Sequence, residues 1–348
     1  MTSAARVTAY AFFLCAAFIS LLPMFTHAQF DYGSGADFTL LISPEHPAPG
    51  DSVTVTAKSS SLNLTTTPVT WYVNGTSRAG DKGTSIQVVA GALGSKTTVD
   101  AVVGSTAAGG TAIIRPTEMD LLWESDSYVP PFFRGRALPS AGTALRLQAL
   151  TRFKRDTVTV PDSSITFTWR RNGYVIQSVS GAGKSQAVID APPLFGTDII
   201  SVDAETGDGQ LSASASVRIP SATPVLALYE DHPLFGILYH SALGAQNAVP
   251  ESEMSFAAAP YYVGASSASD PELEYAWQVN GQAIGGDPAH PGEITISATN
   301  SNGIALIELA LGAVHNFFLS ASGSWGVTLS TNGSSGGGGS NPFNGTAQ

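Results

Sequence analysis

One short pattern occurs three times along the chain, at a spacing that fits one small domain per copy. In each copy a tryptophan is followed three residues later by Asn-Gly, at the end of an alternating stretch, at 69–75, 167–173 and 275–281. Alternation predicts a strand, and Asn-Gly predicts a two-residue hairpin turn because both residues tolerate a positive φ. Trp71, Trp169 and Trp277 lie 98 and 108 residues apart. We therefore expect each tryptophan to fill the core of its own module.

The sequence around each copy of the pattern also repeats. A strand-like opening lies at 38–42, 119–123 and 225–229, and a second strand-like run follows it at 52–57, 143–149 and 254–258. After each Asn-Gly come further alternating runs. About seven short strands joined by regular turns are typical of an antiparallel β-sandwich. The chain is therefore predicted to be all-β, with three sandwiches in tandem.

These modules resemble immunoglobulin-like domains of the PKD or bacterial Ig-like type found in bacterial surface proteins. Module three is the most similar, since an Asp270-Pro271 turn leads into the strand of Trp277 as in a PKD domain. It departs from the PKD pattern where Asn280-Gly281 stands in place of a Gly-Asp-Gly turn, and the other modules share only the Trp-x-x-Asn-Gly core. The resemblance covers roughly 37–331. It implies a spacer, adhesive or accessory role, although a fold does not assign an activity.

The chain begins with the pattern of a secretory signal peptide. Arg6 precedes a short apolar core at 11–22, and Thr26-His27-Ala28 resembles a cleavage site. A retained N-terminal anchor is the alternative. The expected organisation is a signal peptide at 1–28, a linker at 29–36, Ig-like domains at 37–116, 117–220 and 221–331 (the last PKD-like), and a disordered Gly/Ser-rich tail at 332–348.

The net charge limits the classes of partner that the chain can bind, and the cysteine content indicates its cellular location. The net charge of −11 makes a nucleic-acid partner unfavourable, because such a chain repels phosphate backbones. The single cysteine, Cys15, lies within the signal peptide, so the mature chain has no disulfide and no zinc-thiolate site. An exported sandwich protein without disulfides suggests a bacterial source. We expect an extracellular or cell-envelope location.

Residues for catalysis or metal binding are scattered. The histidines show no paired spacing, and no Gly-x-Ser-x-Gly motif marks a nucleophile. We expect no enzyme activity, no catalytic residue and no cofactor. Structural calcium between modules remains an alternative, because carboxylates gather in two short stretches. They are Asp203, Glu205 and Asp208, and Asp270, Glu272 and Glu274.

The connection between the first two strands is longer in modules two and three than at 45–50 of module one, and it is rich in apolar side chains. The candidate contact residues are Tyr128, Phe132, Phe133, Arg134 and Arg136 in module two, and Leu234, Phe235, Ile237 and Tyr239 in module three. Exposed apolar clusters mark contact surfaces. Two interpretations stay open: each connection covers the preceding module, or it docks an envelope or surface protein, a polysaccharide or a membrane surface.

These features favour a non-enzymatic exported protein with a structural or adhesive role, for example within a pilus-like surface assembly. A carbohydrate-binding accessory protein and a secreted hydrolase with an unrecognised cleft are the alternatives. Coplanar exposed aromatic rings would indicate the carbohydrate binder. An apolar patch buried between modules or against a partner would indicate the structural component, and a polar cleft with perturbed carboxylates the enzyme.

Overall fold

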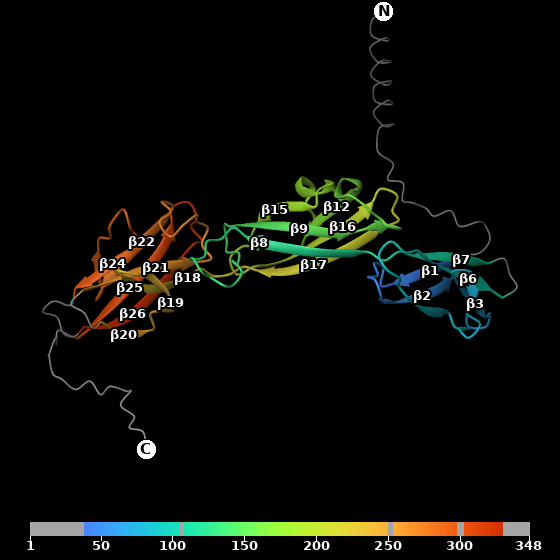
Figure 1. The fold of residues 1–348 in the computed structure, drawn as a ribbon, viewed down its shortest axis with the longest axis horizontal. Coiled ribbons are helices and arrows are strands. Elements are labelled where there is room, and N and C mark those ends of the chain that lie inside the picture. Colours follow the sequence, from blue (N-terminus) through green and yellow to red (C-terminus); the bar gives the residue numbers. More distant parts are fainter. Residues whose placement is uncertain (1–37, 105–107, 250–252, 298–302, 330–348) are drawn as a thin grey trace, which may run out of the picture.

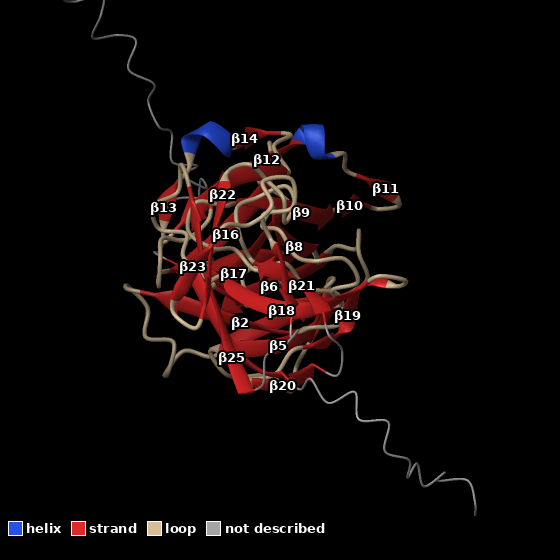
Figure 2. Ribbon diagram, turned by 90° about the vertical axis from the view of Figure 1, so that its left-hand side faces the viewer, coloured by secondary structure: helices blue, strands red, loops and turns tan. Residues whose placement is uncertain are grey.

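The computed structural model of the chain describes residues 38–104, 108–249, 253–297 and 303–329. The expected signal peptide, the linker at 29–36 and the tail at 332–348 lie outside these residues. Within them, almost every regular element is a strand, and no helix is long and apolar enough to cross a membrane. Figure 2 shows the two short 3₁₀ turns, η1 (Asp162–Ser164) and η2 (Gln177–Val179), at one edge of an otherwise β structure.

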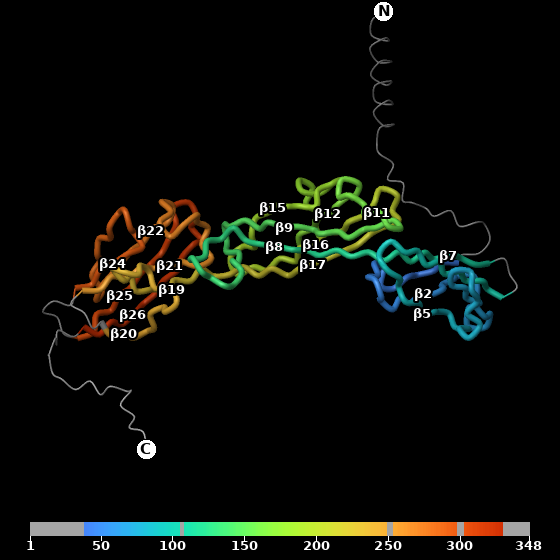
Figure 3. Tube along the Cα trace, in the orientation of Figure 1, coloured from blue at the N-terminus to red at the C-terminus, as the bar shows by residue number. Residues whose placement is uncertain are grey.

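Three modules follow one another in a row, each with its own core (Figures 1 and 3). Module one contains β1 (Phe38–Ser43), β2 (Ser52–Ser59), β3 (Val69–Val73), β4 (Thr76–Ser77), β5 (Ser85–Val89), β6 (Thr97–Val103) and β7 (Gly109–Ile114). Its two sheets have the strand orders β1-β2-β5 and β4-β3-β6-β7.

Module two repeats this arrangement and adds a small hairpin. Its strands are β8 (Glu118–Ser125), β9 (Ala144–Arg152), β10 (Lys154–Arg155), β11 (Val158–Thr159), β12 (Ile165–Arg171), β13 (Tyr174–Val175), β14 (Gly181–Ala182), β15 (Gln186–Asp190), β16 (Thr197–Thr206) and β17 (Ser212–Pro220). The sheets run β15-β9-β8 and β13-β12-β16-β17, and β10 pairs with β11.

Module three has the same two sheets, each extended by one extra edge strand. Its strands are β18 (Val225–His232), β19 (Gly236–Ala242), β20 (Gln246–Val249), β21 (Glu253–Tyr261), β22 (Leu273–Val279), β23 (Gln282–Ile284), β24 (Glu293–Ser297), β25 (Gly303–Ala313) and β26 (Ala321–Leu329). The orders are β19-β18-β21-β24 and β20-β26-β25-β22-β23. Three tandem Ig-like sandwiches, as predicted, therefore make up the fold.

The repeated tryptophans occupy equivalent places in the three cores. Trp71 and Trp169 are 0 % exposed and Trp277 is 2 % exposed. Each indole N–H donates to a backbone carbonyl 2.9 Å away, on Gly83, Lys184 and Pro291 respectively. A large apolar ring that also satisfies its one polar group is well suited to fill such a core.

The connection between β18 and β21 differs from its sequence-based interpretation. This long connection was interpreted as lying between two strands, but its His232 and His240 lie on β18 and β19, which pair as a hairpin. The turn between them is closed by a hydrogen bond from Phe235 N–H to the His232 carbonyl (3.1 Å), and Gly236 has a φ of +68°. A glycine that accepts a positive φ lets the chain reverse where an irregular connection was expected.

Candidate functional site

The junction between modules one and two is bonded directly, chain to chain. Thr117 N–H donates to the Pro47 carbonyl of module one (3.0 Å), while the Thr117 hydroxyl donates to the Ser212 carbonyl of module two (2.6 Å). Beside it, the Ser212 hydroxyl lies 3.0 Å from Nδ1 of His46. These contacts tie the end of module one to the β16–β17 turn region of module two.

A second contact at this junction depends on a glycine. Asp156, in the β10–β11 hairpin of module two, donates its N–H to the Gly94 carbonyl of module one (3.2 Å). Gly94 has a φ of +87°, and a Cβ atom placed there would lie 2.0 Å from the Asp156 carbonyl oxygen. Because that neighbour is backbone, it has little freedom to move. The close approach of the two modules therefore requires glycine at this position.

The junction between modules two and three is bonded in the same direct manner. Tyr128 of module two and the chain around Val263 of module three form an isolated antiparallel bridge. Tyr128 N–H donates to the Val263 carbonyl (2.7 Å), and Tyr262 N–H donates to the Tyr128 carbonyl (2.8 Å). The Tyr128 side chain packs against the core of module three. Asn316 adds a bond from its side-chain amide to the Ala141 carbonyl (2.8 Å).

The aromatic connection of module two packs on the following module, so the interpretation that each connection covers the preceding module is wrong for module two, whereas the connection of module three does contact the module before it. The Phe133 ring meets the rings of Tyr261 and Tyr262 edge-on, at centroid distances of 5.6 and 6.1 Å. The reason lies in the topology, since the connection follows β8 at the end of module two that faces module three (Figure 1). In module three, β19 also reaches this junction, where Tyr239 meets Phe132.

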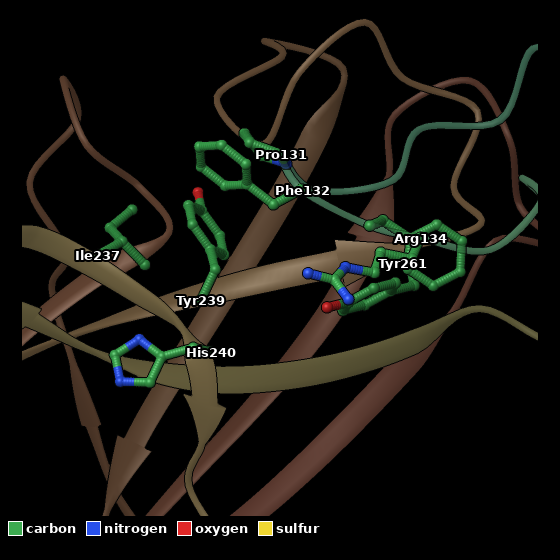
Figure 4. Close-up of a pocket in the computed structure, with 8 residues that line it drawn as sticks. Pro131, Phe132, Arg134, Ile237, Tyr239, His240 and Tyr261 are labelled. Carbon is green, nitrogen blue, oxygen red and sulfur yellow. The ribbon is translucent and has the colours of Figure 1, made fainter.

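A cleft of about 440 Å³ opens at this junction. Figure 4 shows how its lining side chains face the open space, with Phe132 above Tyr239 on one side and Tyr261 on the other. It is lined by Pro131, Phe132, Phe133 and Arg134 of module two, and by Ile237, Tyr239, His240 and Tyr261 of module three. Its volume lies within the range of about 300–1,000 Å³ typical of small-molecule sites.

Phe132 and Arg134 are exposed side chains on the module-two side of the cleft. Phe132 is 88 % exposed although its backbone is held at a φ of +65°, an unusual conformation for a bulky side chain. Arg134 is also exposed, and no acidic side chain of the described residues pairs with it. In Figure 4 its guanidinium points into the space between Tyr261 and the Phe132–Tyr239 pair. The cleft thus offers both aromatic surface and a cation.

The tyrosines of the cleft form a connected cluster with Tyr229. The hydroxyls of Tyr229 and Tyr261 are 2.6 Å apart, and the rings of Tyr229 and Tyr239 are 5.4 Å apart. Burial raises the pKa of Tyr261, and the hydrogen bond with Tyr229 raises it further. Burial also raises the pKa of Tyr239, with smaller contributions from neighbouring tyrosines, Asp231 and Glu293. These phenols therefore stay neutral at physiological pH, available to donate and accept hydrogen bonds.

A smaller cleft of about 170 Å³ adjoins the first, and Ile237 and Tyr239 line both. Small side chains form much of its wall, including Ala257 and Ala259 of β21. Among its other lining residues, His290 Nδ1 lies 3.4 Å from a carboxylate oxygen of Glu293. The two clefts therefore share Tyr239, with Arg134 in the lining of the larger one and a histidine–carboxylate pair in the lining of the smaller one.

The remaining sequence-predicted contact residues lie apart from this cleft. Leu234 and Phe235 are exposed at the tip of the β18–β19 hairpin, where the Phe235 ring packs on His232 at 4.7 Å. Arg136 lies over the Trp123 ring of its own module, 4.4 Å from the ring centroid. The structure thus brings together Phe132, Phe133, Arg134, Ile237 and Tyr239, places Tyr128 in the junction behind them, and leaves the other residues outside.

Sequence reasoning missed Tyr261, Tyr262 and His240, although they complete the cluster. Tyr261 ends β21 and Tyr262 follows it, and the three alanines and Pro260 that precede them gave no sign of an inter-module contact. A pair of adjacent aromatic residues at the end of a strand was the sequence feature that could have indicated this contact. His240 required knowledge of the β19 strand, which the sequence pattern did not suggest.

The proposed carboxylate stretches do not assemble as metal ligands. Within the described ranges, no three His, Cys, Asp or Glu side chains come together as a metal site. Asp270 instead accepts hydrogen bonds from the Ser266 N–H and hydroxyl, both at 2.7 Å, and from the Glu272 N–H. These bonds lower its pKa. Asp208 has a lowered pKa as well, mainly because the Thr206 hydroxyl donates to it.

Comparison with known proteins gives structural likeness alone. No protein-family model and no curated protein matches the chain. Among solved structures, the three N-terminal domains of the bacteriophage RB49 Highly Immunogenic Outer Capsid protein are 15 % identical, with 84 % of this chain and 98 % of that chain covered and a TM-score of 0.24. The central fibronectin-III array of RIM-binding protein is 11 % identical over 84 % and 96 % of the two chains, with a TM-score of 0.28. The fibronectin(III)-like modules of Clostridium thermocellum CbhA are 16 % identical over 60 % and 94 %, with a TM-score of 0.20.

Proposed function

We propose that this chain is a non-enzymatic, exported surface protein of a bacterium, in which three Ig-like sandwiches, the third of them PKD-like, form a stiff spacer that presents the junction of modules two and three. The observation that carries the proposal is the direct bonding at both junctions. Flexible arrays join their domains through exposed linkers with few contacts. Here backbone hydrogen bonds join each module to the next.

The modules are also closely packed at both junctions. Tyr128 of module two packs against the core of module three, and Gly94 of module one admits the backbone of Asp156. Bending at either junction would break hydrogen bonds and expose apolar surface, both of which cost free energy. A chain built in this manner holds its modules at fixed angles, as a structural or adhesive element requires.

The chemistry of the cleft supports a binding role over catalysis. A general acid for hydrolysis is usually a carboxyl group whose pKa is raised toward neutrality. Among the described residues, Asp208 and Asp270 are the carboxyl groups with a shifted pKa; hydrogen bonds in turns lower both values, and neither residue lines the clefts. The aromatic rings around the cleft lie at 55° to 75° to one another. They do not form the coplanar platform expected for an extended glycan chain.

Surface labelling of the cells that express the chain tests the export component. An antibody raised against module three is applied to intact cells and to permeabilised cells. Staining of intact cells is the expected result, together with loss of residues 1–28 from the mature chain by mass spectrometry. Staining that requires permeabilisation would contradict the proposal.

A further inference from the structure

We infer that the paired clefts at the junction of modules two and three bind a short oligosaccharide with one carboxylate-bearing unit, such as a disaccharide of a uronic acid and a neutral sugar. This inference goes beyond the spacer role and does not depend on it. The clefts share Ile237 and Tyr239 and so offer adjoining subsites around one tyrosine. The larger subsite holds Arg134, and the smaller one holds Glu293 and His290.

The aromatic surface suits the apolar face of a sugar ring. Phe132 is 88 % exposed and lies 6.4 Å from Tyr239 between ring centroids, with the ring planes tilted by 55°. Phe133 is held edge-on against Tyr261 and Tyr262 and forms a fixed wall. Rings at such angles cup one or two sugar units, whereas a long chain needs a flat platform. The ligand is therefore short, or the end of a longer chain.

The polar groups select a charged sugar. Arg134 presents a planar donor that matches the two oxygens of a carboxylate. The chain as a whole carries a net charge of −11, so an anion is attracted here by a local cation and repelled by most of the remaining surface. Beyond Tyr239, Glu293 accepts from sugar hydroxyls and His290 donates or accepts. The carboxylate of the sugar is therefore expected to bind in the larger cleft, at Arg134.

The β19 strand argues against a peptide in an extended conformation. Such a peptide binds by adding a strand to a regular sheet edge with free N–H and C=O groups. β19 is an edge strand, but its pairing with β18 shifts register between Tyr229 and Asp231. Irregularities of this kind block edge-to-edge pairing. The side chains, and not the backbone, therefore carry recognition at this site.

Calorimetric titration tests the inference with the whole protein. The probes are disaccharides in which galacturonate, glucuronate or mannuronate is joined to glucose, each with its neutral counterpart made with galactose, glucose or mannose. At least one uronate disaccharide should bind, and more tightly than its neutral counterpart. Arg134→Gln should weaken that binding by about tenfold or more, the cost of losing a charge-assisted hydrogen bond, and leave the neutral sugar unaffected.

Two matched controls separate the site from general surface effects. Arg146→Gln removes an exposed arginine of β9 and should change nothing. Phe132→Ala should abolish binding of both sugars, while Tyr174→Ala, at an equally exposed aromatic residue on β13, should not. The inference is overturned if no uronate disaccharide binds, if Arg134→Gln binds as well as the unmutated protein, or if proline-rich peptides or anionic lipid vesicles bind in place of the sugars. None of these results bears on cell-surface labelling or on the stiffness of the array.

Discussion

Asn172 and Ile199 exchange a pair of hydrogen bonds in which the asparagine side chain takes the part of a backbone carbonyl. Asn172 N–H donates to the Ile199 carbonyl, and Ile199 N–H donates to the Asn172 side-chain oxygen, both at 2.8 Å. The pair adds one step to the β12–β16 ladder at the hairpin turn. The same exchange joins Asn74 to Thr98 and Asn280 to Leu306. Asparagine is thus bonded at this position in every module.

Replacing this asparagine separates its two roles. Asn172 has a φ of +53°, which asparagine and glycine tolerate better than other residues. Asn172→Ala should lower the free energy of unfolding of module two by about 1–3 kcal/mol, because it loses the side-chain bonds and strains the turn. Asn172→Gly loses the bonds alone and should cost less. Urea unfolding of both variants measures the difference, and equal stability of Asn172→Ala and the unmutated protein would contradict it.

Gly94→Ala should loosen the junction between modules one and two and leave each module folded. The new Cβ would lie 2.0 Å from the Asp156 carbonyl oxygen, so the two modules must separate. Gly50→Ala is the matched control, since Gly50 has a similar φ of +85° with nothing within 4 Å. Small-angle X-ray scattering should show a broader range of shapes for Gly94→Ala alone. Identical scattering from both variants would show that the close contact between Gly94 and Asp156 does not make the junction stiff.

The two adjacent phenylalanines of module two should behave differently. Phe133→Ser removes the contacts with Tyr261 and Tyr262 and should free the junction of modules two and three. Phe132→Ser alters a side chain that is mostly in solvent and should leave the junction in place. Limited proteolysis between the modules reports the difference, with faster cleavage for Phe133→Ser. Equal cleavage of the two variants would show that the Phe133 contacts do not hold the modules together.

Two half-buried tyrosines of module three, Tyr261 and Tyr275, should make the module sensitive to alkali. Burial raises the pKa of Tyr275 and Tyr261 above the ordinary value of 10.0. As the pH rises, these phenols lose their protons in the unfolded chain before they do so in the folded one. This ionisation stabilises the unfolded state relative to the folded state, so the free energy of unfolding falls above pH 10. Below that pH the phenols are neutral in both states and stability is unaffected. Ultraviolet titration should show these tyrosines ionising after the exposed ones, and a single common titration near pH 10 would refute the effect.

The repeated strand pattern could be predicted from the sequence, whereas the residues that meet at the junction between modules could not. The alternating runs and the Trp-x-x-Asn-Gly core predicted three sandwiches, because strand periodicity and turn chemistry are local properties. Phe132 and Arg134 stood out as apolar and charged residues in an unusually long connection. Tyr261 and His240 join them only through the β18–β19 hairpin and the Tyr128 bridge. Such contacts depend on how two modules meet, which no short stretch of sequence encodes.

The stiffness of the array is the central claim, and distances between spin labels on neighbouring modules test it most directly. With Cys15 replaced by serine, exposed positions Lys82, Gln177 and Gln282 of the three modules accept cysteine labels in pairs. Pulsed electron–electron double resonance should give one narrow distance distribution for each pair of labels on neighbouring modules, namely positions 82 and 177, and positions 177 and 282. Broad distributions for both pairs would show modules that move independently and would contradict the proposed spacer.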